Sequence, residues 1–214
     1  RSTYDRTIVA EYQFDSDDFS DDFAPGVELS SDVALSPGGL LFCVLQGSEA
    51  QDDEIVALDA QTMRLRCRFG HGLLSGAQHV CVIADELYVC DKGNDRLQVF
   101  SLAGEHRRSI VGEWEHPQHL CVVNNRLYLH VDPTREDQEV TFSVCVARRI
   151  LVLSMQGDIL QEFTHPTEDA VEFLSICYFD HKLLVSYLYD ENIWGSADPE
   201  TDGDRKYSYG MLAL

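Results

Sequence analysis

The sequence has little positive charge. Its 214 residues include 16 lysines and arginines against 37 aspartates and glutamates, a formal net charge of −21 at pH 7. Proteins that bind nucleic acid or anionic lipid surfaces need basic residues to contact phosphate groups. The composition therefore argues against both nucleic acid and a membrane surface as partners.

Long apolar runs and familiar catalytic motifs are also lacking. No stretch reaches the roughly 18 apolar residues that suggest a membrane-spanning helix, and no signal peptide is recognisable. The chain has no G-x-S-x-G, no glycine-rich phosphate loop and no H-E-x-x-H. We therefore expect no membrane span, and we favour a protein without enzymatic activity.

The seven cysteines form no C-x-x-C pair. Cys81, Cys121 and Cys177 recur at one position of a repeated apolar run, and the others also lie in strand-like runs. This pattern favours small buried side chains over disulfides or zinc ligands. It predicts a reducing, intracellular location, cytoplasmic or otherwise.

What the chain does contain is a repeated strand pattern, clearest between Gln78 and Val111. Apolar residues alternate there in four short runs, the spacing of β-strands whose side chains switch face at every residue. Residues 84–86, 91–95 and 103–105 separate the runs and carry the Gly, Asn and Asp typical of turns. Four strands in so short a unit need neighbours of the same kind to bury their faces.

Those neighbours are visible along the chain. The run Q-H-L-C-V at Gln118 repeats Q-H-V-C-V at Gln78, and R-L-Y-L at Arg126 repeats E-L-Y-V at Glu86. A period of about 40–50 residues with four strands per unit is typical of β-propellers. We therefore predict an all-β fold, a β-propeller of four-stranded antiparallel blades with four repeats visible.

One repeat also resembles a known family. The segment from Tyr88 to Phe100 reads Y-V-C-D-x-x-N-x-R-L-Q-V-F, with Gly104 following, and it is similar to a blade of the NHL-repeat β-propeller family. The other repeats lack the D-x-x-N-x-R turn. The resemblance implies that Asp91, Asn94 and Arg96 hold the bend between the second and third strands.

The repeats predict a single propeller domain over residues 1–214, divided into blades at 32–70, 77–112, 117–164 and an incomplete 172–214. Residues 7–14 read as a fourth strand of a split or preceding blade. Two arrangements fit this pattern. The N-terminal strand could close a four-blade ring, or the chain could be a fragment of the roughly six-bladed ring that the resemblance implies.

Acidic residues gather at one end of the predicted strands. In an up-and-down blade, the inter-blade links and the second-to-third-strand loops share one face. That face receives 28 of the 37 acidic residues, in segments 15–32, 46–54, 91–95, 113–116, 132–139, 168–172 and 190–204. Such a face steers basic partners. The candidate partner-binding residues in its loops are Asp52, Asp53, Asp137, Trp194 and Asp202.

The innermost strands suggest a second candidate site. The repeat alignment places Asp32, His79, His119 and Ser175 at one equivalent position around the central channel. Two histidines and a carboxylate are ligands that suit zinc, so His79, His119 and Asp32 are the candidate metal ligands. The run D-P-E-T-D-G-D at Asp198 has half of a calcium-loop spacing. We expect no cofactor, with zinc or calcium as the alternative.

Two functions follow from these patterns. The first is a non-enzymatic NHL-type propeller module that recognises a protein or peptide, basic in character, through its acidic loop-bearing face. The alternative is a metal-dependent lyase or lactone hydrolase with its site at the mouth of the channel. An NHL-like family of amidating lyases uses a channel zinc with histidine ligands, and this sequence lacks an identifiable third channel histidine.

Overall fold

The computed structural model describes residues 28–47, 53–131, 149–164, 171–179, 182–190 and 207–213. These residues form four antiparallel sheets, three of four strands and one of three, and they include no α-helix. Each sheet is built from consecutive strands, so each corresponds to one blade of the predicted repeat. No helix in this part of the chain is long and apolar enough to cross a membrane.

The strands of the first two blades follow one another without crossover. Blade 1 consists of β1 (Glu28–Leu35), β2 (Leu40–Gln46), β3 (Asp53–Asp59) and β4 (Leu65–Leu74). Blade 2 consists of β5 (Ala77–Ile83), β6 (Glu86–Asp91), β7 (Arg96–Ser101) and β8 (His106–Ile110), with a short 3-10 helix, η2 (Lys92–Asn94), between β6 and β7.

The last two blades repeat this order. Blade 3 consists of β9 (Pro117–Val123), β10 (Arg126–Val131), β11 (Arg149–Leu153) and β12 (Ile159–Thr164). Blade 4 has three described strands, β13 (Val171–Phe179), β14 (Lys182–Asp190) and β15 (Tyr207–Ala213). Strands thus begin at Glu28, before the predicted start of blade 1 at residue 32, and β4 runs past its predicted end at residue 70.

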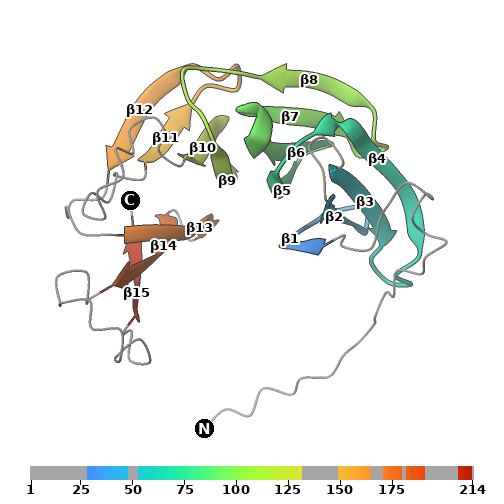
Figure 1. Ribbon diagram of the computed structural model, residues 1–214, viewed down its shortest axis with the longest axis horizontal. Coiled ribbons are helices and arrows are strands. Elements are labelled where there is room, and N and C mark those ends of the chain that lie inside the picture. Colours follow the sequence, from blue (N-terminus) through green and yellow to red (C-terminus); the bar gives the residue numbers. More distant parts are fainter. Residues whose placement is uncertain are drawn as a thin grey trace, which may run out of the picture.

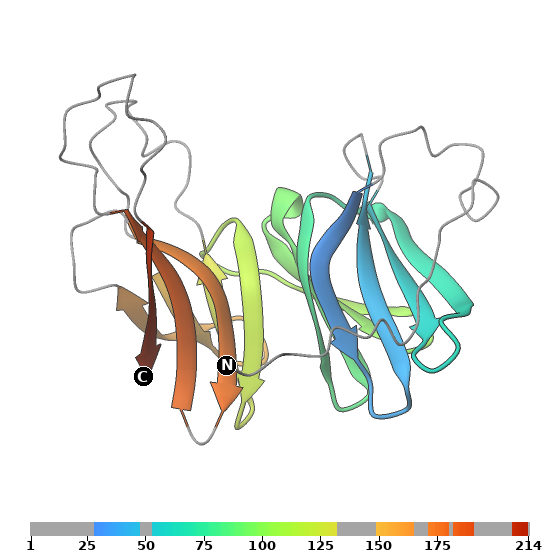
Figure 2. The same cartoon turned by 90° about the horizontal axis from the view of Figure 1, so that it is seen from below.

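The blades stand side by side around a central space (Figure 1). The first strands, β1, β5, β9 and β13, lie innermost and contact one another in sequence order. The fourth strands, β4, β8 and β12, lie on the outside (Figure 1). Seen from below, the inner strands run roughly along the axis of this arc (Figure 2). In each blade the second strand therefore ends, and the third begins, on the face where the chain passes from one blade to the next.

Apolar side chains fill the spaces between neighbouring blades. Blades 1 and 2 share a buried cluster that includes Phe42, Ile55 and Phe100. Blades 2 and 3 share another, around Leu97, Trp114 and Leu127. A smaller cluster joins blade 4 to blade 3 and contains Ile150, Ile176 and Val185. The sheets of blades 2 and 3 thus bury apolar side chains on both faces.

Turn residues predicted from the sequence take the expected backbone conformations. Ala84 in the β5–β6 hairpin and Asp95 after η2 have positive φ values of 54° and 51°. Gly104, between β7 and β8, has a φ of 89°, and a Cβ there would lie 2.6 Å from the Phe69 ring of blade 1. Glycine is therefore required at this turn both for its conformation and for the close approach of blade 1.

The first and last blades do not share a sheet in the part of the chain that the structure describes. They lie on opposite sides of the central space (Figure 1). The described strands therefore do not make the pairing that would seal a four-blade ring. The segment predicted to seal it, residues 7–14, lies outside the described residues.

Candidate functional site

Three of the four channel-mouth candidates lie on adjacent inner strands. The Nδ1 atom of His79 on β5 lies 2.7 Å from a carboxylate oxygen of Asp32 on β1. The Nε2 atom of the same ring lies 2.8 Å from the carbonyl oxygen of Leu120 on β9. Asp32 also accepts the backbone N–H of Val80 at 2.7 Å. The His79 ring thus connects blades 1, 2 and 3 at the central channel.

The groups around the His79 ring determine which of its nitrogen atoms donates a hydrogen bond. The Leu120 carbonyl oxygen can only accept, so Nε2 of His79 donates to it, while Nδ1 faces a carboxylate. Burial alone would raise the pKa of Asp32. The hydrogen bond and charge of His79, the Val80 N–H and the charge of His119 outweigh that effect, so the pKa of Asp32 is lowered.

His119 extends this contact into a row of imidazoles. Its ring centre lies 5.3 Å from that of His79 and 5.9 Å from that of His130, with which it is stacked. His130 is 2% exposed and lies opposite His119 in the β9–β10 pairing. His130 was not among the residues expected at the channel, although it occupies the position that Cys90 holds in blade 2.

A local irregularity precedes each of these inner-strand positions. The strand register shifts between Ala77 and His79 in blade 2, and at His130, the partner of His119, in blade 3. Such an extra residue bends a strand and turns the next side chain. In blade 4 the shift falls just before Ser175, whose backbone pairs with Ser186. Ser175 thus shares the register of His79 and His119, and its side chain is outside the described residues.

The candidate metal ligands form an ion pair and a ring contact. Among the described residues, no group of three or more His, Cys, Asp or Glu side chains is arranged to hold a metal ion. A metal at His79 would have to displace Asp32 or the Leu120 carbonyl from a ring nitrogen. Zinc binding here stays a prediction, and the calcium-like run at residues 198–204 lies outside the described residues.

Asp53 does not lie in a solvated loop, where its assignment as a candidate partner-binding residue placed it. It is the first residue of β3 rather than a loop residue, and it is 3% exposed. Its carboxylate accepts the backbone N–H groups of Ala77 at 2.6 Å and of Gly47 at 3.0 Å. The side chain thus fixes the link from blade 1 to blade 2. Asp52, Asp137, Trp194 and Asp202 lie outside the described residues.

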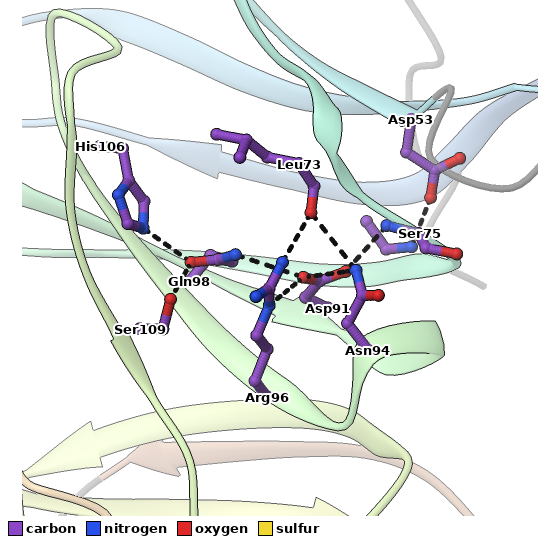
Figure 3. A network of polar contacts seen from close by, with 10 residues as sticks. Asp53, Leu73, Ser75, Asp91, Asn94, Arg96, Gln98, His106 and Ser109 are labelled. Atoms are coloured by element: carbon purple, nitrogen blue, oxygen red, sulfur yellow. Dashed lines mark hydrogen bonds and ion pairs between the residues drawn. The ribbon is translucent and has the colours of Figure 1, made fainter.

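The Asp91 turn is a structural joint. Asp91 is fully buried and accepts from Ser75 N at 2.8 Å, from Asn94 Nδ2 at 2.9 Å and from Arg96 Nε at 2.8 Å. Asn94 and Arg96 also donate to the carbonyl oxygen of Leu73 (Figure 3). These side chains therefore hold the bend between β6 and β7, as predicted. They also hold the chain that arrives from blade 1.

Gln98 extends this network to the outer strand β8. Its amide lies 2.8 Å from both Ser109 Oγ and His106 Nε2 (Figure 3). When the side-chain oxygen and nitrogen of Gln98 exchange places, the oxygen accepts hydrogen bonds from the Arg96 guanidinium. The nitrogen then donates to Ser109 Oγ and His106 Nε2. This network of hydrogen bonds thus crosses blade 2 from the inter-blade link to the outer strand β8. Its polar groups serve as hydrogen-bond donors and acceptors for one another.

Some acidic side chains of the acidic loop-bearing face are exposed to solvent, and others are held by hydrogen bonds. Glu113 and Glu115, in the link between blades 2 and 3, are exposed. Asp95 is held in place, because its carboxylate accepts the backbone N–H of His116 at 2.8 Å. Glu54 pairs with Arg68 at 2.6 Å. The acidic residues of this face thus divide into those that secure the loops and those that extend into solvent.

The thiols are poor candidates for nucleophiles. Cys43, Cys67, Cys81, Cys90, Cys121 and Cys177 are all free. Burial raises the pKa of Cys81 and of Cys121 to about 12. Because the thiolate is the reactive form, burial makes the Cys81 and Cys121 thiols poor nucleophiles at neutral pH. They fill space between blades, as their recurrence in apolar runs predicted.

Comparison with known proteins establishes the fold class. No family model and no curated protein matches the sequence. Among solved structures, the hydrazine synthase of Kuenenia stuttgartiensis is similar over 86% of this chain and 50% of that one, with a TM-score of 0.59 and 15% identity. A luciferin-regenerating enzyme has a TM-score of 0.55 at 14% identity, over 75% of this chain and 53% of that one.

A third similar structure is a streptogramin B lyase, with a TM-score of 0.51 and 14% identity over 83% of this chain and 53% of that one. The chain thus spans about half the length of these structures. They are β-propeller-like proteins, and the chain accordingly has a β-propeller fold. Identities this low carry no information about activity.

Proposed function

We propose that this chain is an NHL-type propeller module without catalytic activity, which holds a basic protein or peptide on its acidic loop-bearing face. The observation that carries the proposal is the distribution of charge. The segments assigned to that face contain 28 of the 37 acidic residues of the sequence. A surface with one dominant sign of charge raises the encounter rate and the selectivity for partners of the opposite sign.

The opposite face supports the proposal by contrast. Two of its described acidic side chains form close pairs with arginines: Asp59 with Arg66 at 2.6 Å, and Glu86 with Arg108 at 2.6 Å. A third pair, between Glu105 and Arg107, is longer at 3.4 Å. These three carboxylates are therefore balanced locally, which leaves less negative charge on that face to attract a basic partner.

The Asp91 joint supports the NHL-type assignment. The resemblance expects an aspartate, an asparagine and an arginine to hold this bend, and all three side chains bond to one another or to the same carbonyl group. The free thiols support the location proposed for the module, a reducing compartment inside the cell.

Charge reversal tests the binding proposal. The variant E113K/E115K should bind an oligolysine peptide about tenfold more weakly, because each reversal removes an attraction and adds a repulsion. Fluorescence anisotropy of a labelled peptide at low salt measures the affinity. The matched control is D85K/E105K, which makes the same charge change at exposed residues of the opposite face.

Equal losses in the two variants would show that only net charge matters, and would contradict a site on the acidic face. An unchanged affinity in E113K/E115K would contradict it as well. The alternative, a metal-dependent lyase or lactone hydrolase, makes a separate prediction. It requires stoichiometric zinc or calcium in the purified protein by elemental analysis, lost in H79A/H119A.

A further inference from the structure

The outer strands β4, β8 and β12 share one irregular position near their start. The register shift against the third strand skips one residue of each outer strand, and these residues are Arg66, Arg107 and Leu160. Such an extra residue is a β-bulge. Each one follows by three residues a turn residue with positive φ, namely Met63, Gly104 and Gly157. The bulge is therefore the same in three blades, and only its chemistry differs.

Blade 2 shows that the bulge is exposed even where both neighbouring blades are present. Blade 2 packs against blades 1 and 3, and the side chain of its bulge residue, Arg107, is still 54% exposed. A charged bulge on an edge strand protects that edge from pairing with another chain. Blades 1 and 2 have this protection. Blade 3 instead presents Leu160, 53% exposed, and before it Ile159, 42% exposed.

A third exposed apolar residue, Val111, lies near these two. A Cβ atom on Gly157, in the turn before β12, would lie 2.7 Å from Cγ2 of Ile110 and 2.9 Å from the carbonyl oxygen of Val111. The end of β8 therefore lies against the start of β12 at the outer rim (Figure 1). Val111 is 64% exposed. The apolar rim patch at the junction of blades 2 and 3 consists of Val111, Ile159 and Leu160.

Acidic side chains flank the apolar rim patch. Glu113, two residues beyond Val111, is exposed on the acidic loop-bearing face, and Asp158, immediately before Ile159, is also exposed. The nearby arginines of β8 are paired with carboxylates: Arg107 with Glu105 at 3.4 Å, and Arg108 with Glu86 at 2.6 Å. The patch therefore combines apolar surface with negative charge, and it is continuous with the acidic face at Glu113.

We propose that the apolar rim patch binds the apolar stripe of a basic amphipathic helix, which belongs to the partner held on the acidic face. The bulge at Leu160 interrupts the edge of β12, so an added strand would not pair along it. A partner therefore makes its contacts through side chains. A helix with lysines on both sides of an apolar stripe fits the patch and the carboxylates that flank it. This inference rests on the proposed function and specifies the class of partner.

Fluorescence anisotropy with two labelled peptides at low salt tests the proposal on the whole chain. One peptide, of about 15 residues, has leucines along one face of a helix and lysines elsewhere. The other is an oligolysine with the same number of lysines. The wild-type protein should bind the amphipathic peptide about tenfold more tightly, because its leucines cover exposed apolar side chains. V111S/L160S should abolish this preference and leave the affinity for oligolysine unchanged.

Two further variants make the test specific. V33S/L35S is the matched control, because it also replaces one valine and one leucine, which are 55% and 62% exposed on β1. It should keep the preference for the amphipathic peptide. L160R gives the bulge of blade 3 the residue type that blades 1 and 2 carry there, so it is compatible with the fold. It should lose the preference, with an unchanged circular dichroism spectrum.

Several results would overturn the proposal while the proposed function stands. These are equal affinities of the wild-type protein for the two peptides, a preference that survives V111S/L160S and L160R, and an equal loss in V33S/L35S. A wild-type dimer in light scattering that V111S/L160S converts to a monomer would show that a second copy covers the patch, and would also overturn it. An oligolysine affinity that E113K/E115K leaves unchanged would contradict the proposed function instead.

Discussion

Replacement of Asp91 by alanine should lower the free energy of unfolding by about 3–5 kcal/mol, the cost of removing one partner from a buried ion pair. The carboxylate is fully buried and accepts hydrogen bonds from Ser75 N, Asn94 Nδ2 and Arg96 Nε. Without it, the Arg96 guanidinium keeps only part of its hydrogen bonding, and the Ser75 N–H loses its acceptor. Urea denaturation followed by tryptophan fluorescence and circular dichroism measures the change.

The matched control for Asp91 is D59A. Asp59 also pairs with an arginine, Arg66, but that arginine side chain is 57% exposed. Exposed ion pairs contribute little to stability, and the hydrogen bonds that Asp59 also accepts from Gln61 N, Thr62 N and Thr62 Oγ1 lie in an exposed turn. D59A should therefore lose much less stability than D91A. Similar midpoints for D91A and D59A would contradict the structural role of the Asp91 joint. The conservative variant D91N, which retains an acceptor oxygen, should lie between D91A and the wild type.

The repeat and its turns could be predicted because they depend on local chemistry. Strand alternation, the Gly104 turn and the residues of the Asp91 bend are all encoded within short segments. The partner of that bend was not predictable in the same way. Asp91 holds Ser75 and Arg96 holds Leu73, both in the chain that arrives from blade 1. The sequence of the repeat does not specify how close the chain from blade 1 will pass to the Asp91 bend.

The placement of Asp53 in a loop was wrong for the same reason, because the contact that holds it lies in the next blade. In the sequence it stands in an acidic, glycine-containing stretch that reads as a solvated loop, yet its carboxylate binds Ala77 N in the next blade. Asp32 and Asp95 likewise accept backbone N–H groups, those of Val80 and His116, which lie in or just before the following blade. Carboxylates near the links therefore serve first to satisfy backbone donors between blades. Sequence counts of acidic residues overstate the charge that is free to bind a partner.

The inner-strand site was predictable in position but not in its contacts. Repeat alignment brought Asp32, His79 and His119 to one level of the channel, and in the structure the His79 ring contacts both Asp32 and the ring of His119. The alignment could not show that the His79 ring would bridge a carboxylate in one blade and a carbonyl group in another. That depends on the spacing of neighbouring inner strands, and on the register shift just before His79.

Replacement of His79 by phenylalanine should destabilise the protein by about 1.5–3 kcal/mol, the range for hydrogen bonds that involve charged groups. The ring volume is nearly kept, so the loss reports the two polar contacts, to Asp32 and to the Leu120 carbonyl group. The control is H71F. His71 has a 56% exposed side chain and lies 3.7 Å from Glu54, so its replacement should leave the unfolding midpoint nearly unchanged.

The pH dependence of D32N separates the ion pair from simple packing. The pKa of Asp32 is lowered in the folded protein, so the unfolded chain binds the proton more tightly. The stability that Asp32 contributes is therefore complete above the ordinary aspartate pKa of about 3.9, and is lost as pH falls through the lower folded value. The difference in unfolding free energy between wild type and D32N should shrink as pH falls below about 4. A difference that stays flat across the acid range would show that the carboxylate charge contributes nothing, and that His79 joins the blades through packing alone.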